Sequence, residues 1–287
     1  MKHVIFFFVC ILSMTQIAKA QTQSDTLNIE EFTYDTKNDL KIYCVRPADY
    51  NEDKEYPAIV IFHGGGWYMG EASWGFSNAK HYAQKGMVAF SVQYRLQDLG
   101  KGITPYESVL DAQTALRWVR KNSDTFSINK NKVAAYGWSA GAHLAACAAI
   151  FDNLDTPDED ISSAPDLLAL KSPALSLLVY SDFQKRLLDK IEVKNLSPAE
   201  NVSENTPPTI IVMGRTDTVT PLQGSELFKN NMDTYGNDCK LVIYDNVGHL
   251  FTPETEPDDG WPNPDKKVSA KAQEEIDNFL KTYGYIH

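Results

Sequence analysis

The sequence predicts an α/β fold in which a mostly parallel sheet is covered by helices on both faces. Short, largely apolar segments alternate along the chain with amphipathic segments whose apolar residues recur at helical spacing. A strand that is buried on both faces is apolar throughout, and parallel strands need a crossover connection, usually a helix. The alternation of the two patterns therefore indicates right-handed strand–helix–strand units.

The first two expected strands differ in pattern from the rest. Residues 27–34 and 40–46 alternate apolar and polar side chains, which is typical of an antiparallel hairpin with one solvated face. We expect this hairpin at one edge of the sheet. The apolar strands that follow are expected at residues 58–62, 87–93, 133–136, 167–170, 209–213 and 241–244.

Helices are expected between these strands. In the segment 106–121, for example, Val109, Ala112 and Leu116 fall on one face of a helix. Further helices are expected after Ser139 and at residues 77–85, 182–191, 222–235 and 268–283, and the polar stretch 152–163 is expected to be a loop. Because no linker interrupts the alternation, we expect one domain over residues 21–287.

Length and charge limit the classes of function. A chain of 287 residues can bury a substantial core. Its net charge of −11 repels the phosphates of nucleic acids and anionic membranes, and no cluster of basic residues offsets it. We therefore expect no nucleic-acid partner. No segment after residue 20 is long and apolar enough to span a membrane, and nothing in the sequence predicts an oligomeric state.

The first twenty residues have the pattern of an export signal. Lys2 and His3 make a basic start, residues 4–12 form an apolar run, and Ala18-Lys19-Ala20 fits a cleavage site. The run is too short to span a bilayer. We expect residues 1–20 to be a signal peptide, cleaved after Ala20, and the mature protein to be secreted or periplasmic. The alternative is that this run is a buried first strand or helix.

The cysteines do not form a disulfide framework. Cleavage would remove Cys10 and leave Cys44, Cys147 and Cys239, so at most one bridge can form within the mature chain. Cys147 lies in the alanine-rich segment after Ser139 and is expected to be a small buried apolar residue. No spacing of His, Cys or Asp resembles a metal site, and no cofactor is expected.

One motif indicates a nucleophile. Gly137-Trp138-Ser139-Ala140-Gly141 stands between the expected strand 133–136 and an alanine-rich helical segment. A G-x-S-x-G sequence in this context is typical of a sharp turn that lifts the serine hydroxyl clear of the sheet. Side chains at positions 137 and 141 would collide with the neighbouring strand and helix. Ser139 is therefore the candidate nucleophile, and the Ala140 amide at the helix start can stabilise negative charge.

A second motif fits the same chemistry. His63-Gly64-Gly65-Gly66-Trp67 follows the expected strand 58–62. Three consecutive glycines cost backbone entropy, so a close approach of the main chain to a ligand is a reason for their presence. The free amides of this loop, together with that of Ala140, predict an oxyanion hole for a tetrahedral acyl-transfer intermediate. The alternative is a flexible turn without a role in binding.

A serine hydroxyl needs a neighbouring base to become a nucleophile. His81 lies in a helix before Ser139 and is interpreted as a surface residue, whereas His143 lies inside the helix after it and is interpreted as packed. His249 follows the last expected strand, in a loop at the carboxyl edge of the sheet. We therefore choose His249 as the candidate base.

The imidazole of such a base needs a carboxylate on its other nitrogen. Asp217 follows the apolar strand 209–213 after a short turn, which places it at the same edge of the sheet. Asp182 is the reserve candidate, because it follows the preceding strand more loosely. Asp245 is a weaker candidate, because it is close to His249 in sequence. The aspartates of the stretch 152–163 are interpreted as solvated loop residues.

With Ser139, Asp217 and His249 in this order, each after a strand, the chain resembles the α/β-hydrolase fold. It is similar to carboxylesterases with an H-G-G-G-W oxyanion loop, and among these to secreted bacterial esterases related to hormone-sensitive lipase and to acetyl-xylan or feruloyl esterases. The resemblance runs from about Leu27 to the C-terminus. It also rests on the pairs Tyr94-Arg95, Pro207-Pro208 and Gly248-His249.

The chain departs from hormone-sensitive-lipase relatives in two respects. Trp138 and Ala142 stand where those relatives usually have Asp and Gly. Their long N-terminal cap helices are also missing, so we expect only a minimal cap over the site.

The resemblance implies a serine carboxylesterase without a cofactor. Ser139 would attack the ester carbonyl, His249 would move the proton, and Asp217 would orient His249. The oxyanion would be held by the amides of Gly65, Gly66 and Ala140.

The expected substrate is a small or carbohydrate-borne ester of acetyl or feruloyl type. Aromatic residues beside the motifs are candidates for substrate contact: Trp67, Tyr68, Trp138 and Trp261, with Trp74 nearby. They could stack on a sugar ring or a feruloyl group, or only pack the loops themselves. Two other interpretations are an amide hydrolase of the same fold, formamidase or peptidase-like, and a non-catalytic α/β-hydrolase used for binding.

Overall fold

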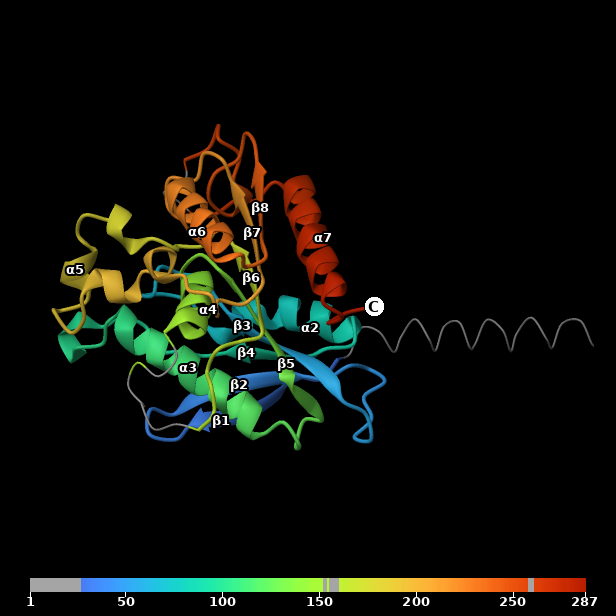
Figure 1. The fold of residues 1–287 in the computed structure, drawn as a ribbon. Coiled ribbons are helices and arrows are strands. Elements are labelled where there is room, and N and C mark those ends of the chain that lie inside the picture. The colour runs from blue at the N-terminus through green and yellow to red at the C-terminus, as the bar shows by residue number, and fades with distance from the viewer. Residues whose placement is uncertain (1–26, 152–153, 155–159, 258–260) are drawn as a thin grey trace, which may run out of the picture.

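An eight-stranded sheet forms the centre of the computed structural model, with strand order β1-β2-β4-β3-β5-β6-β7-β8. The structure describes residues 27–151, 154, 160–257 and 261–287. The predicted export signal at residues 1–20 lies outside the described residues, as does most of the predicted loop 152–163. Helices cover both faces of the sheet, as predicted (Figure 1).

The hairpin at the sheet edge is confirmed. Strands β1 (Glu30–Asp35) and β2 (Leu40–Val45) pair antiparallel, and β2 also pairs antiparallel with β4 (Val88–Val92). All other neighbours in the sheet pair in parallel. The parallel strands besides β4 are β3 (Tyr56–Phe62), β5 (Ile128–Trp138), β6 (Leu167–Lys171), β7 (Thr209–Gly214) and β8 (Cys239–Tyr244).

Two apolar cores lie on the two faces of the sheet. Along β3, Val60 and Phe62 belong to one core and Ile59 and Ile61 to the other, because successive side chains of a strand point to opposite faces. The first core is covered by α3 (Pro105–Lys121), α4 (Ala140–Ile150) and α6 (Leu222–Tyr235), and the second by α2 (Phe76–Gln84) and α7 (Lys266–Thr282). Figure 1 shows α6 and α7 on opposite sides of β7 and β8.

The predicted helix at residues 182–191 is wrong in length. Only α5 (Phe183–Arg186) is helical, and Leu188 and Asp189 have φ angles of 49° and 56°, outside the right-handed helical region. Phe183 and Leu187 are nevertheless buried in the core, so their apolar spacing reflects burial without a continuous helix.

Short 3₁₀ helices complete the described chain. They are η1 (Ala72–Gly75), η2 (Leu99–Lys101), η3 (Leu177–Val179), η4 (Val193–Leu196), η5 (Pro198–Asn201) and η6 (His249–Phe251). Three of them, η3, η4 and η5, lie with α5 in the connection between β6 and β7. This connection is the longest departure from simple strand–helix alternation in the described part of the chain.

Cys44, Cys147 and Cys239 are buried free thiols, so none of the disulfides left open by the sequence is formed. Burial raises the pKa of Cys44 and of Cys239 to about 12, which keeps both thiols protonated. No helix in the part of the chain that the structure describes has the length and apolar character to cross a membrane.

Candidate active site

Ser139 occupies a sharp turn between β5 and α4. Its backbone has φ 54° and ψ −124°, a sparsely populated conformation that costs energy and that the surrounding structure must enforce. A Cβ on Gly137 would lie 2.4 Å from the carbonyl carbon of Gly141, and a Cβ on Gly141 would lie 2.1 Å from the carbonyl oxygen of Phe62. Both glycines are therefore required by close backbone approach, as the sequence predicted.

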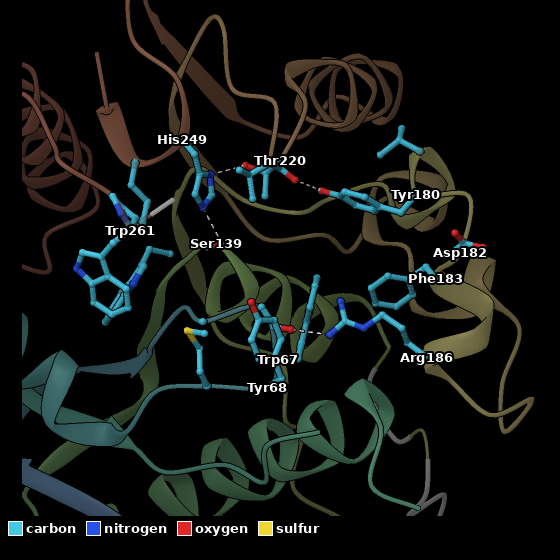
Figure 2. A pocket seen from close by; sticks show the side chains of 18 of the residues that line it. Trp67, Tyr68, Ser139, Tyr180, Asp182, Phe183, Arg186, Thr220, His249 and Trp261 are labelled. Carbon is cyan, nitrogen blue, oxygen red and sulfur yellow. Dashed lines mark hydrogen bonds between the residues drawn. The ribbon is translucent and has the colours of Figure 1, made fainter. Parts of the chain in front are cut away.

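A chain of hydrogen bonds joins Ser139, His249 and Asp217. The Nε2 atom of His249 lies 3.0 Å from the Ser139 Oγ atom (Figure 2). Its Nδ1 atom lies 3.0 Å from Asp217 Oδ2. A carboxylate can only accept, so Nδ1 carries the proton and Nε2 can accept from the serine hydroxyl. All three side chains are buried. The structure thus brings together the three residues that the sequence selected.

Asp217 is held in place by the turn that follows it. Its Oδ1 atom accepts the amides of Val219 and Thr220 at 3.0 and 2.7 Å, and its Oδ2 atom accepts the Thr220 hydroxyl at 2.8 Å. The Thr220 hydroxyl also lies 3.2 Å from His249 Nδ1. Sequence analysis missed Thr220; the available signal was that an aspartate side chain often bonds the backbone two residues on, which predicts a turn after Asp217.

The competing carboxylates lie elsewhere. Asp182 has a side chain 74% exposed and pairs with Lys185, and Asp245 is exposed and pairs with Arg215. Neither is hydrogen-bonded to His249. Their positions agree with the lower rank that the sequence gave them.

The two histidines that the sequence ranked below His249 as bases also lie outside the hydrogen-bonded chain. His81 is half-buried and pairs with Asp277 of α7 at 3.0 Å, so its interpretation as a simple surface residue was incomplete. His143 is fully buried in α4, as predicted, and its Nδ1 atom accepts the indole N–H of Trp67 at 3.2 Å. Burial lowers the pKa of His143 to about 4, which keeps its ring neutral.

The glycine loop after β3 has its carbonyl groups fixed. The Gly64 carbonyl accepts the Nδ1–H of His63 at 2.6 Å, and the Gly65 carbonyl accepts the amides of Tyr68 and Met69 at 3.1 and 3.0 Å. In a planar, trans peptide group the N–H points opposite to the carbonyl of the preceding residue. The Gly65 amide therefore points away from the direction of the Gly64 carbonyl, and the Gly66 amide away from that of the Gly65 carbonyl.

These amides belong to the same pocket as Ser139. Gly65 and Gly66 have φ angles of 119° and 59°, which only glycine adopts readily, and both line the pocket that contains Ser139 and His249. The Ala140 amide at the first turn of α4 has no acceptor within its helix. Gly65 and Gly66 thus line the pocket, and the Ala140 amide beside Ser139 is a further donor; the oxyanion hole made of these three amides stays a prediction.

His63, at the start of this loop, is itself held in place by Tyr94. Its ring stacks on Tyr94 at 4.3 Å between centroids, and the Tyr94 hydroxyl donates to the His63 carbonyl at 2.8 Å. Burial lowers the pKa of His63 to about 4, so the ring is neutral and its Nδ1–H is available for the Gly64 carbonyl.

The pocket at the carboxyl edge of the sheet has a volume of about 990 Å³. All four aromatic residues singled out in the sequence line it. Trp67 is buried and Trp138 half-buried, whereas Tyr68 and Trp261 are 58% and 75% exposed at its rim. Trp261 contacts Trp74 edge-on, with ring centroids 5.5 Å apart.

Sequence analysis missed several residues of the pocket wall. They include Met69, Tyr180, Phe183, Arg186, Val219 and Leu250. Most of them lie in the β6–β7 connection or in turns, where no motif or periodicity distinguishes a wall residue from any other loop residue. Among the described residues, no cluster of His, Cys, Asp or Glu is suited to hold a metal ion.

Four features together define an α/β-hydrolase. They are the mostly parallel sheet, the serine at a strand–helix turn, the histidine after the last strand and the glycine-rich loop after β3. Residues 44–174 match the BD-FAE family model, and residues 181–284 match that of the dienelactone hydrolase family. Esterase 2 of Thermogutta terrifontis, in a form phosphoramylated by tabun, is 32% identical with a TM-score of 0.79. That match covers 90% of this chain and 96% of the other. The chain belongs to the esterases of the α/β-hydrolase fold.

Curated relatives are longer proteins. Esterase LipC of Mycobacterium tuberculosis is 26% identical over 70% of this chain and 52% of its own length. Acetylxylan esterase of Xylanibacter ruminicola is 25% identical over 85% of this chain and 50% of its own length. Endo-1,4-beta-xylanase B of Butyrivibrio fibrisolvens is 30% identical over 63% of this chain and 30% of its own length. The chain thus spans about half or less of these relatives.

Proposed function

We propose that the protein hydrolyses carboxylic esters through a covalent acyl-enzyme on Ser139. The observation that carries this proposal is the hydrogen-bonded chain from Ser139 Oγ through His249 to Asp217, beside the amide-lined loop. In the first step, His249 Nε2 takes the hydroxyl proton as Ser139 Oγ attacks the ester carbonyl carbon. The negative charge that develops on the carbonyl oxygen is stabilised by the amides of Gly65, Gly66 and Ala140.

The remaining steps use the same groups in reverse. His249 gives its proton to the leaving alcohol oxygen as the carbon–oxygen bond breaks, which leaves the acyl group on Ser139. A water molecule then attacks the acyl carbon while His249 accepts its proton. As the second tetrahedral intermediate collapses, the bond to Ser139 Oγ breaks, His249 returns the proton to Oγ and the acid is released. Asp217 keeps the proton of His249 on Nδ1 throughout and stabilises the imidazolium form.

We further propose a small or carbohydrate-borne ester of acetyl or feruloyl type as the substrate. The pocket volume of about 990 Å³ accommodates a sugar or a phenolic group, and Trp261 and Tyr68 are exposed aromatic residues that line it. Similarity to an acetylxylan esterase supports a glycan-borne acyl group. Secretion or periplasmic export is proposed on the basic start, the apolar run and the Ala18-Lys19-Ala20 site of the first twenty residues.

The test compares esters with amides on one enzyme preparation. We expect hydrolysis of 4-nitrophenyl acetate, and release of acetate or ferulate from acylated xylan, with both lost in Ser139→Ala. Turnover of aminoacyl anilides or formamides without turnover of esters would instead assign an amide hydrolase. Unchanged hydrolysis in Ser139→Ala would refute the assignment of the nucleophile.

A further inference from the structure

Arg186 places a fixed positive charge in the candidate active-site pocket. Figure 2 shows its guanidinium across the pocket from Ser139 and His249. Its Nε and Nη2 atoms donate to the Gln97 side-chain oxygen at 2.8 and 2.6 Å, and Nη2 also donates to the Gly66 carbonyl at 2.6 Å. These bonds hold the side chain in one position at the wall of the pocket.

Aromatic rings cover the faces of the same guanidinium. Its central carbon lies 5.0 Å from the ring centre of Trp67 and 5.2 Å from that of Phe183. Such cation–π contacts are attractive and exclude water from the faces of the group. Only the edge of the guanidinium therefore remains for further hydrogen bonds.

Arg186 has no carboxylate partner among the described residues. Its acceptors, Gln97 and the Gly66 carbonyl, are neutral. Asp182, which also lines the pocket, is paired with Lys185 at 2.6 Å. By contrast, four other arginines form ion pairs: Arg46 with Glu30, Arg95 with Asp111, Arg120 with Asp166 and Arg215 with Asp245.

The pKa shifts of the arginines reflect this difference. Burial lowers the pKa of Arg186, whereas for Arg95 the hydrogen bond and charge of Asp111 outweigh burial and raise the pKa. An arginine nevertheless stays ionised at neutral pH. The pocket therefore contains a partly desolvated cation that lacks a counter-charge in the described chain.

One edge of the guanidinium is open. The Nη1 atom has no acceptor in the described chain, yet it is not among the buried, unpaired nitrogen atoms, so it is accessible to solvent, and Arg186 itself lines the pocket. A planar guanidinium with free N–H groups is the side chain best suited to bind a carboxylate.

We propose that Arg186 binds a carboxylate carried by the ester substrate, and that the enzyme prefers esters with such an anionic group. This inference rests on the proposed function, because it assumes ester hydrolysis in this pocket. The carboxylate can belong to the acyl part, as in a half-ester of a dicarboxylic acid, or to the alcohol part, as in an acylated uronic acid. Both present the same group to the guanidinium.

The experiment uses two matched substrate pairs. For the acyl side, 4-nitrophenyl hydrogen succinate is compared with neutral 4-nitrophenyl pentanoate, after correction for spontaneous hydrolysis. For the alcohol side, acetate release from an acetylated methyl glucuronoside is compared with release from the acetylated methyl glucoside. We expect the kcat/KM of the wild-type protein to favour the anionic member of one pair by about 10- to 100-fold.

Variants of Arg186 separate charge recognition from loop support. Arg186→Gln removes the charge, and its shorter side chain ends near the position of Nε, where it can still donate to Gln97 but does not reach the Gly66 carbonyl. The preference for the anionic ester should disappear, whereas the lost support of the loop should lower kcat/KM for neutral and anionic esters alike. Arg186→Lys keeps the charge and should retain part of the preference. Arg215→Met, which removes an exposed charge away from the pocket, should keep all of it.

Two results would overturn the inference while leaving the proposed function intact. One is hydrolysis of the neutral esters without preference for either anionic partner. The other is an equal loss for neutral and anionic esters in Arg186→Gln and Arg186→Lys, which would show that Arg186 only supports the oxyanion loop. No hydrolysis of any ester by the wild-type protein would refute the proposed function, and this inference with it.

Discussion

Replacement of Asp217 by Asn tests the geometry of the site most directly. The Oδ1 atom of Asp217 accepts two backbone amides, from Val219 and Thr220, while Oδ2 faces His249 Nδ1 and the Thr220 hydroxyl. An asparagine has one acceptor oxygen and one donor nitrogen. If its nitrogen faced the two amides, two buried hydrogen bonds would be lost, at about 1–3 kcal/mol each.

The introduced asparagine would therefore place its oxygen towards the amides and its N–H towards His249. The imidazole must then move its proton from Nδ1 to Nε2, because two donors cannot face each other. A protonated Nε2 would donate to Ser139 Oγ at 3.0 Å and could not accept the hydroxyl proton. We expect kcat to fall about 10⁴-fold, the cost of this tautomer in a serine–histidine–aspartate site. That loss corresponds to about 5.4 kcal/mol in activation free energy.

The assay is steady-state hydrolysis of 4-nitrophenyl acetate by Asp217→Asn, with urea unfolding to check the fold. The free energy of unfolding should change by only about 1 kcal/mol, because most of the bonds to residue 217 remain. Asp245→Asn is the matched control: its carboxylate is exposed and paired with Arg215, so activity should be unchanged. Retention of a tenth of the activity by Asp217→Asn, or inactivity of Asp245→Asn, would contradict the assigned roles.

Three further predictions concern pH, packing and the pocket rim. Burial lowers the pKa of His63 and His143 to about 4, so between pH 6.5 and 4 the unfolded chain binds more protons than the folded one and stability falls as pH falls. From pH 7 to 5 the two histidines together should lower the free energy of unfolding by roughly 3–4 kcal/mol. Urea unfolding of His143→Gln should show only about half of this loss. Equal slopes in both proteins would contradict this. In Gly141→Ala, the new Cβ would lie 2.1 Å from the carbonyl oxygen of Phe62 in β3, so thermal unfolding should show a loss of stability of about 3 kcal/mol or more. Gly100→Ala is the control: its nearest contact would be 3.4 Å, so its stability should change little. In Trp261→Ala, KM for an acetylated xylan should rise about three- to tenfold while that for 4-nitrophenyl acetate stays constant; an unchanged KM for xylan would exclude stacking there.

The positions of the candidate catalytic residues were predictable from sequence because strand ends in a parallel sheet converge. Ser139, Asp217 and His249 each follow a strand that the apolar pattern identifies, and all strands of one parallel sheet end at the same edge. The same reasoning ranked Asp217 above Asp182 and Asp245, and the hydrogen bonds agree. The predicted helix at 182–191 failed because apolar spacing reports burial, which a short turn also satisfies.

The sequence by itself therefore determined the order of the elements, the edge of the sheet at which the chemistry is placed and the glycines that close backbone approach requires. These features depend on local pattern and on general rules of sheet topology. Only the tertiary structure decided which further side chains complete the site around these residues. Arg186 donates to the carbonyl of Gly66, which is 120 residues away in the sequence, and Thr220 contacts His249, which is 29 residues away. Such contacts depend on how an irregular connection folds over the sheet, and neither periodicity nor a motif encodes that path.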